Sequence, residues 1–237
     1  MNNFDPKEDF IKRIYWLIKL RWIAIVGVIL TALFTNQVLQ FSLPKFPFYA
    51  IATFLAAYNL FLIIFLSIIK GQKESLAMLN RLANIQISLD LLSLTILIHF
   101  SGGVENPFIF YFIFHIIIAG ILLSRRASYL QATFAVWLFC LIVILEYFGL
   151  LPHYCLKGFI IHCQHNNILY IGGVSFVFIT TLYIAVYMAT SISLRLRQRE
   201  KILEEANALL KEKDRLKSEY VLRVSHDIKE HLSAIQS

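Results

Sequence analysis

The sequence has few charged residues, few glycines and few prolines. Charged residues make up 16% of its 237 residues and hydrophobic residues 58%, a balance too apolar for a soluble domain of this length. Its nine glycines and five prolines mark loop ends rather than linkers, and the sequence shows no low-complexity segment or internal repeat. We therefore expect a single membrane-embedded unit.

Several apolar runs lack Lys and Arg and are long enough to cross a bilayer as helices, which takes about 20 residues. Barrel strands would alternate in polarity over shorter stretches, and a helix bonds all its backbone amides internally. The sequence thus predicts an all-α membrane protein with six transmembrane helices. We place them at Trp22–Leu39, Pro47–Ile69, Leu82–Phe100, Pro107–Leu123, Ala127–Leu150 and Ile168–Ser191.

The basic residues indicate how these spans are oriented. Most of them precede the first span, separate the second from the third, join the fourth to the fifth, or follow the sixth: Lys7, Lys12, Arg13, Lys19, Arg21, Lys70, Lys73, Arg81, Arg125, Arg126, Arg195, Arg197, Arg199 and Lys201. The other connections carry only Lys45 and Lys157. The positive-inside rule then predicts that both termini are cytoplasmic. The net charge of +7 indicates membrane topology and lipid contact, and we expect no nucleic-acid partner.

Residues 1–20 form a distinct segment before the first span. Phe10, Ile11 and Ile14 interleave with Lys and Arg, which suits a helix at the headgroup level; simple flanking of a membrane anchor is the alternative. The run that follows is too long for a signal-peptide core and lacks a small-residue cleavage pattern. We expect it to be retained.

After Ser193 the composition changes to strong helix formers without Gly or Pro, so the sixth span should continue as one helix. Leucines and isoleucines recur here every seven residues and form an apolar seam: Leu196, Ile202, Leu203, Leu209, Leu210 and Leu216. This seam over residues 194–219 favours a parallel coiled-coil dimer, with a solvated single helix as the alternative. Packed helices switch between discrete arrangements, so such a stalk can transmit a membrane event.

The last stretch, residues 220–237, contains Ser225-His226-Asp227. Val221, Val224 and Ile228 share one helical face, and His226 falls roughly opposite it, so the imidazole should face solvent. An unprotonated imidazole nitrogen can attack phosphorus while a neighbouring carboxylate holds the proton on the other nitrogen. We therefore interpret His226 as a phosphoacceptor and Asp227 as its acid–base partner.

Residues 225–232, Ser-His-Asp-Ile-Lys-Glu-His-Leu, resemble the phosphoacceptor box of sensor histidine kinases, usually Ser-His-Glu-Leu-Arg-Thr-Pro-Leu. The resemblance implies that His226 is autophosphorylated from ATP within a homodimer and that a response-regulator Asp receives the phosphoryl group. Glu230 stands where the family commonly has Thr or Asn used in dephosphorylating the regulator, which puts phosphatase activity in doubt. His231 replaces the usual Pro, and we assign it no chemistry.

The 237 residues contain no Walker loop, kinase glycine-rich loop or Asn-rich ATP-binding segment. We therefore expect a fragment that is inactive alone, with ATP bound by a domain elsewhere. Its expected parts are an N-terminal segment (1–20), a six-helix sensor domain (21–193), a coiled-coil helix (194–219) and the truncated start of a dimerisation and phosphotransfer domain (220–237).

A short turn between the third and fourth spans carries a second resemblance. Gly102, Gly103, Asn106, Pro107 and Phe108 match the Gly-Gly-x-x-Asn-Pro-Phe heptapeptide of the RegB/PrrB family of redox-responsive membrane kinases. This resemblance implies ubiquinone binding beside six spans, in the inner membrane of a bacterium. A tight turn is the alternative for the motif.

A quinone needs an apolar slot and hydrogen-bond donors for its carbonyl oxygens. Asn106, His99 or His115 are the expected donors, near aromatic side chains that include Phe108. Asp90, His115 and Glu146 are ionisable groups within spans, which makes them candidates for function or for hydrogen bonds between packed helices. We assign none of these three to catalysis.

The cysteines allow several interpretations. RegB/PrrB kinases have a redox-active Cys near the phosphoacceptor, but no Cys follows Cys163 here. Cys155 and Cys163 lie in an expected outside loop together with three histidines: His153, His162 and His165. This set suits an oxidised pair, a soft metal or free thiols, and its spacing matches no standard zinc signature. We therefore assign no metal ligand.

Two other functions fit part of the sequence. A six-span transporter or channel would use the polar residues within spans to line a path. A non-catalytic short protein could instead dimerise with a complete kinase and regulate it. The stalk and the phosphoacceptor box favour the sensor-kinase interpretation.

Overall fold

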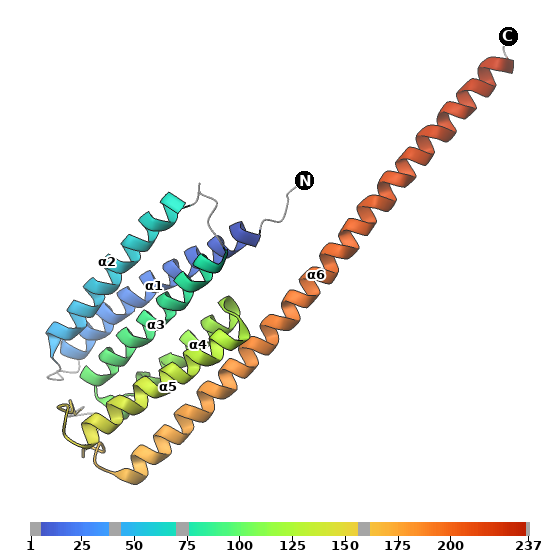
Figure 1. Cartoon of the computed structure of the whole chain (residues 1–237). Coiled ribbons are helices and arrows are strands. Elements are labelled where there is room, and N and C mark those ends of the chain that lie inside the picture. Colours follow the sequence, from blue (N-terminus) through green and yellow to red (C-terminus); the bar gives the residue numbers. More distant parts are fainter. Residues whose placement is uncertain (1–5, 38–43, 70–75, 156–161, 236–237) are drawn as a thin grey trace. The chain divides into compact units, whose positions relative to one another are not determined.

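The computed structural model describes residues 6–37, 44–69, 76–155 and 162–235, and all regular structure within these ranges is helical. The chain divides into two units, Met1–Thr190 and Ser191–Ser237. The helices, shown in Figure 1, are α1 (Pro6–Gln37), α2 (Lys45–Ile69), α3 (Leu76–Phe100), α4 (Tyr111–Leu122), α5 (Arg125–Tyr147) and α6 (Ile168–Ile235), with 3₁₀ turns η1 (Gly103–Glu105) and η2 (Pro107–Phe110). The expected all-α fold is confirmed.

Five helical stretches are long and apolar enough to cross a membrane. They are Phe10–Thr35, Lys45–Ile68, Ala77–Phe100, Arg125–Tyr147 and Ile168–His226. The fourth expected span is a shorter apolar stretch, Pro107–Leu122, which starts with the 3₁₀ turn η2 and has Pro107 at its first position. Its 16 residues rise by about 26 Å, close to the roughly 30 Å of a hydrocarbon core.

Some expectations concern residues outside the described ranges. These are residues 1–5 of the N-terminal segment, the end of the first expected span at Leu39, the basic residues Lys70, Lys73 and Lys157, the side chains of Asp227, Glu230 and His231, and the terminal Ser237.

α1 has no break at the expected boundary after residue 20. It runs from Pro6 to Gln37, and its first half buries Ile11, Ile14 and Ile18 against side chains of α2 and α3. Their spacing places them on one helical face. This first half of α1 therefore packs against α2 and α3, and its placement at the headgroup level stays a prediction.

The second half of the first unit packs around three aromatic rings. Phe178 of α6 lies 5.3 Å from Phe112 of α4 and 4.2 Å from Phe139 of α5, measured between ring centroids, and all three are fully buried. Further along α4 and α6, a Cβ added at Gly120 would lie 2.6 Å from the Cβ of Ala189. Small residues allow this close approach of α4 and α6, as is typical of membrane helices.

A buried ion pair joins the first three helices. The guanidinium of Arg21, 4% exposed, donates from Nε to Asp90 Oδ1 at 2.9 Å and from an Nη to Oδ2 at 2.7 Å. Its other Nη donates to Asn59 Oδ1 at 2.9 Å, and Asn59 Nδ2 donates to the carbonyl oxygen of Ile18. Arg21 was expected among the basic residues that precede the first span; the structure places it inside the bundle, because Asp90 and Asn59 compensate its charge.

The substitution Arg21→Leu tests this ion pair. It leaves the Asp90 carboxylate buried without its guanidinium, so we expect the free energy of unfolding to fall by about 3–5 kcal/mol. The double variant Arg21→Leu/Asp90→Leu should recover most of this loss. Thermal unfolding in detergent is monitored with a fluorogenic maleimide. This reagent reacts with the free thiol of Cys140 in α5 as the protein unfolds.

Arg223→Leu provides the control. Arg223 forms an exposed pair with Glu219 at 3.1 Å on α6, so its loss should change stability by less than about 1 kcal/mol. An Arg21→Leu variant that unfolds at the wild-type temperature would contradict the structural role of the buried pair.

Candidate functional site

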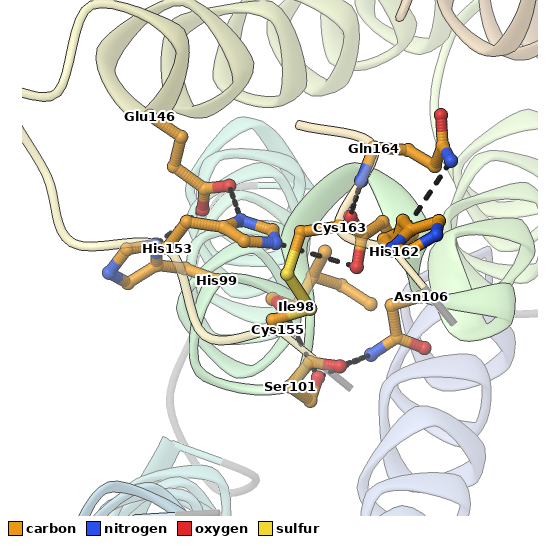
Figure 2. A network of polar contacts seen from close by, with 11 residues as sticks. Ile98, His99, Ser101, Asn106, Glu146, His153, Cys155, His162, Cys163 and Gln164 are labelled. Carbon is orange, nitrogen blue, oxygen red and sulfur yellow. Dashed lines mark hydrogen bonds and ion pairs between the residues drawn. A yellow bond between two sulfur atoms is a disulfide. The ribbon is translucent and has the colours of Figure 1, made fainter. Parts of the chain in front are cut away.

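Carboxylates and imidazoles cluster at the end of the bundle where α3 and α5 finish and α6 begins. His99 ends α3, Glu105 lies in η1, Glu146 is in the last turn of α5, and His153 and His165 lie in the connection between α5 and α6. Figure 2 shows His99 and His153 on either side of the Glu146 carboxylate. Segments far apart in the sequence thus bring their ionisable groups together.

The carboxylate of Glu146 fixes the ring orientation of two histidines, His99 and His153. Its Oε1 lies 2.6 Å from His99 Nδ1 and its Oε2 lies 2.6 Å from His153 Nδ1. An ionised carboxylate only accepts hydrogen bonds, so both imidazoles donate from Nδ1. Hydrogen bonds to a charged acceptor are short and strong, and these two bonds satisfy a carboxylate that is almost completely buried.

The other ring nitrogen of His153 faces a second carboxylate. Its Nε2 lies 3.5 Å from Glu105 Oε2, and the two side chains are 4% and 0% exposed. The Glu105 carboxylate also accepts a bond, at Oε1, from the backbone N–H of Gln164. The ring of His165 stacks on that of His153, with 4.2 Å between centroids.

The two stacked histidines have pKa values displaced in opposite directions. Burial alone would lower the pKa of His153, but the hydrogen bond and charge of Glu146, together with Glu105, outweigh burial and raise it. Burial, and then the charge of His153, lower the pKa of His165. Near neutral pH, His165 is therefore the more easily kept neutral of the two.

The glycines of the heptapeptide let the loop approach Glu146. Gly102 and Gly103 have φ values of 114° and 53°, a backbone conformation that favours glycine. A Cβ added at Gly103 would collide with the Glu146 carboxylate. The pair therefore turns the chain tightly after α3 and places η1, with Glu105, beside the end of α5.

Asn106 fastens the same loop. Its Nδ2 donates to the carbonyl oxygen of Ser101 at 2.9 Å and to the Ser101 hydroxyl, while its Oδ1 accepts from the N–H of Phe108 at 2.8 Å. Pro107 follows at the first position of η2, where its missing N–H costs no hydrogen bond. Both the amide N–H groups and the oxygen of Asn106 are thus engaged within the loop.

A disulfide between Cys155 and Cys163 closes the connection from α5 to α6. Of the alternatives open from the sequence, the oxidised pair is therefore the one present. By restricting the unfolded chain, closure of so short a loop is worth about 2–3 kcal/mol. His153 and Gln164 lie just outside its two ends, so the disulfide constrains the groups that contact Glu146 and Glu105.

The sequence matches a known family over most of its length. The model of a six-helix transmembrane domain, described as the PilS-like transmembrane domain, matches residues 5–203. The chain belongs to this family. No curated protein and no solved structure matches it. PilS is a sensor histidine kinase, so the family match supports the interpretation of this chain as the membrane sensor part of such a kinase.

The other residues that the sequence predicted for a ligand site lie outside the histidine–carboxylate cluster. His115 lies on α4 away from the cluster, with its Nδ1 3.0 Å from the carbonyl oxygen of Tyr111, and His162 is exposed. Phe108 is partly exposed and its ring lies 5.2 Å from that of Tyr111. The three expected quinone donors are Asn106, His99 and His115. Of these, only His99 is hydrogen-bonded to Glu146 in the described structure. Quinone binding stays a prediction.

His226 and Asp227 lie on the part of α6 that follows the PilS-like domain, and His226 is exposed. Sequence reasoning missed Glu105. Its signal was the Gly102-Gly103 pair two residues earlier, since a loop that needs such a backbone approaches another element closely. The assignment of His226 and Asp227 as reacting groups stays a prediction.

The substitution Gly103→Ala tests the close approach of the loop. The positive φ and the collision with Glu146 should together lower stability by about 1–3 kcal/mol. Gly27→Ala in α1 is the control, since a Cβ there meets no other group within 4 Å and should be neutral or stabilising. In the same maleimide assay, the cost of Gly103→Ala should shrink in a Glu146→Ala background. Equal stability of Gly103→Ala and wild type would contradict this account.

Proposed function

We propose that this chain is the sensor part of a two-component histidine kinase, in which His226 is phosphorylated from ATP and passes the phosphoryl group to a response-regulator Asp. One observation carries the proposal: a PilS-like six-helix domain ends in a helix that runs unbroken from Ile168 through the Ser225-His226-Asp227 box. ATP is bound by a domain outside these 237 residues. The family match makes a transporter or channel the weaker interpretation.

The reaction requires an accessible imidazole. A ring nitrogen of His226 attacks the γ-phosphorus of ATP, the bond from that phosphorus to the bridging oxygen breaks, and ADP leaves. Asp227 holds or accepts the proton of the other ring nitrogen. The exposure of His226 on α6 supports this role, because both the ATP-binding domain and the response regulator need to reach it.

A second copy of the chain is the proposed partner of the stalk. Six seam residues are each between 54% and 65% exposed in the single chain: Leu196, Ile202, Leu203, Leu209, Leu210 and Leu216. Such an apolar stripe at heptad spacing is typical of a parallel coiled coil. Dimerisation would bury it and pair the two His226-bearing helices, with both termini in the cytoplasm of a bacterial cell.

Phosphate transfer from labelled ATP tests the central assignment. In membranes that contain the full-length kinase, we expect wild type to incorporate acid-labile, base-stable label and His226→Gln to incorporate none. His231→Gln is the matched control, because it removes the other histidine of the box and should keep most of the label. Label retained in His226→Gln, or lost only in His231→Gln, would overturn the assignment.

Ubiquinone is a second candidate, as the ligand that the sensor detects. Partly exposed aromatic side chains beside the heptapeptide favour it: Phe108, Phe110, Tyr111 and Phe114. Rings at this spacing can hold a planar apolar ligand. The amides of Asn106 and the Nδ1 of His99 are already bonded, so a quinone carbonyl has to exchange with those bonds.

The test of quinone sensing therefore substitutes Phe108. Asn106 is kept, because its hydrogen bonds also hold the loop together. If quinone sensing operates here, label on His226 should depend on whether the added ubiquinone is oxidised or reduced, and Phe108→Ala should abolish that difference. Phe54→Ala on α2, another half-exposed aromatic residue, should preserve it. A redox response of wild-type strength in Phe108→Ala would exclude this aromatic group as the quinone site.

A further inference from the structure

Three buried ligand-type atoms around Glu105 have no hydrogen-bond partner among the described residues. They are Glu105 Oε2, His153 Nε2 and His165 Nδ1. The three residues present their ligand atoms within 4.8 Å of one another. Leaving buried polar atoms unpaired is costly, so convergence of three of them on one point calls for an additional group.

We propose that Glu105, His153 and His165 bind one divalent transition-metal ion, with Zn²⁺ as the reference ion. Two imidazole nitrogens and a carboxylate oxygen form a common ligand set for zinc, and imidazole also suits copper and nickel. Three protein ligands leave a further position for water. The proposal is independent of phosphotransfer at His226.

Hydrogen bonds orient two of the three donors, His153 and Glu105. His153 donates from Nδ1 to Glu146 Oε2 at 2.6 Å, so Nε2 is the ring nitrogen that faces Glu105 Oε2, at 3.5 Å. A metal ion there would replace the proton through which these two groups otherwise form an ion pair. A carboxylate that accepts from the distal ring N–H is the usual support of a metal-bound histidine. The backbone N–H of Gln164 donates to the other oxygen of Glu105, Oε1, and so orients this carboxylate. Glu146 and Gln164 are thus positioning residues.

The spacing of two of the donors already suits zinc. Zinc–ligand bonds of about 2.0–2.2 Å in a tetrahedron put neighbouring ligand atoms about 3.3 Å apart. His153 Nε2 and Glu105 Oε2 lie 3.5 Å apart. The ring of His165 stacks on that of His153, so it has to rotate out of this stack for its Nδ1 to point at the same ion.

Charge supports a cation at this point. Glu105 and Glu146 are both almost completely buried, and each faces His153. These two buried carboxylates carry negative charge, whereas the surrounding imidazoles are positive only when protonated, so a divalent ion is a source of compensating charge. The sulfurs of Cys155 and Cys163 also lie near a Glu105 oxygen, but they are bonded to each other and are not ligands in the oxidised chain.

Direct metal binding tests the proposal. The full chain, without a histidine tag and in non-reducing buffer, is reconstituted in nanodiscs and dialysed against buffered Zn²⁺, and bound metal is counted by mass spectrometry. We expect one Zn²⁺ per wild-type chain, at least tenfold weaker binding in Glu105→Gln and His165→Gln, and roughly 10–100-fold weaker binding in Glu146→Gln. His162→Gln, an exposed histidine of the same loop, should bind like wild type.

A second measurement uses wild type alone, so it does not depend on the folding of a variant. X-ray absorption at the zinc edge should show imidazole scattering with nitrogen or oxygen at about 2.0–2.2 Å and no sulfur near about 2.3 Å. A sulfur shell, binding that appears only after reduction of the disulfide, absence of bound zinc in wild type, or unchanged binding in His165→Gln would each overturn the proposal.

Discussion

An ionised side chain inside a helix bundle in lipid needs a partner from the same protein, because hydrocarbon supplies no hydrogen bonds and little screening. The described part of this chain meets the requirement at two places. Arg21 and Asp90, 69 residues apart, join α1 to α3 and reach α2 through Asn59. Glu146 joins the ends of α3 and α5 to the following connection through two histidines. Each group fixes which helices are neighbours, a choice that apolar packing among similar leucines and isoleucines leaves open.

The sequence predicts the helices better than it predicts their partners. Runs without Lys and Arg locate the spans, and the lack of Gly and Pro after Ser193 predicts the continuity of α6, because both signals are local. The position of Arg21 is not local. A basic residue before an apolar run is normally a flanking charge, and only Asp90, far along the chain, places it inside the bundle. Glu105 escapes prediction for the same reason, since its contacts come from residues 153 and 164.

The heptapeptide shows how a motif and a geometry can support different functions. Its likeness to a quinone-associated sequence rests on Gly102, Gly103, Asn106, Pro107 and Phe108. In the structure the two glycines allow the loop to reach Glu146, and the amide of Asn106 holds the loop closed. These contacts need the same residue types whether or not a quinone binds. The motif by itself therefore specifies the shape of the loop. Support for a bound ligand has to come from groups that are not used within the loop, such as the partly exposed ring of Phe108.

The histidine–carboxylate cluster lies at the start of the helix that carries the phosphoacceptor box. His165 comes just before Ile168, where α6 begins, and the disulfide ties the preceding connection together. Phe178 and Ala189 then pack this helix against α4 and α5 within the first unit. Under the proposals above, a metal ion bound in the cluster would act on the first turn of α6. Close contacts such as those at Gly120 and Phe139 favour discrete over gradual rearrangements of packed helices. A discrete displacement of α6 would suit the proposed kinase function, because this helix also contains the phosphoacceptor box.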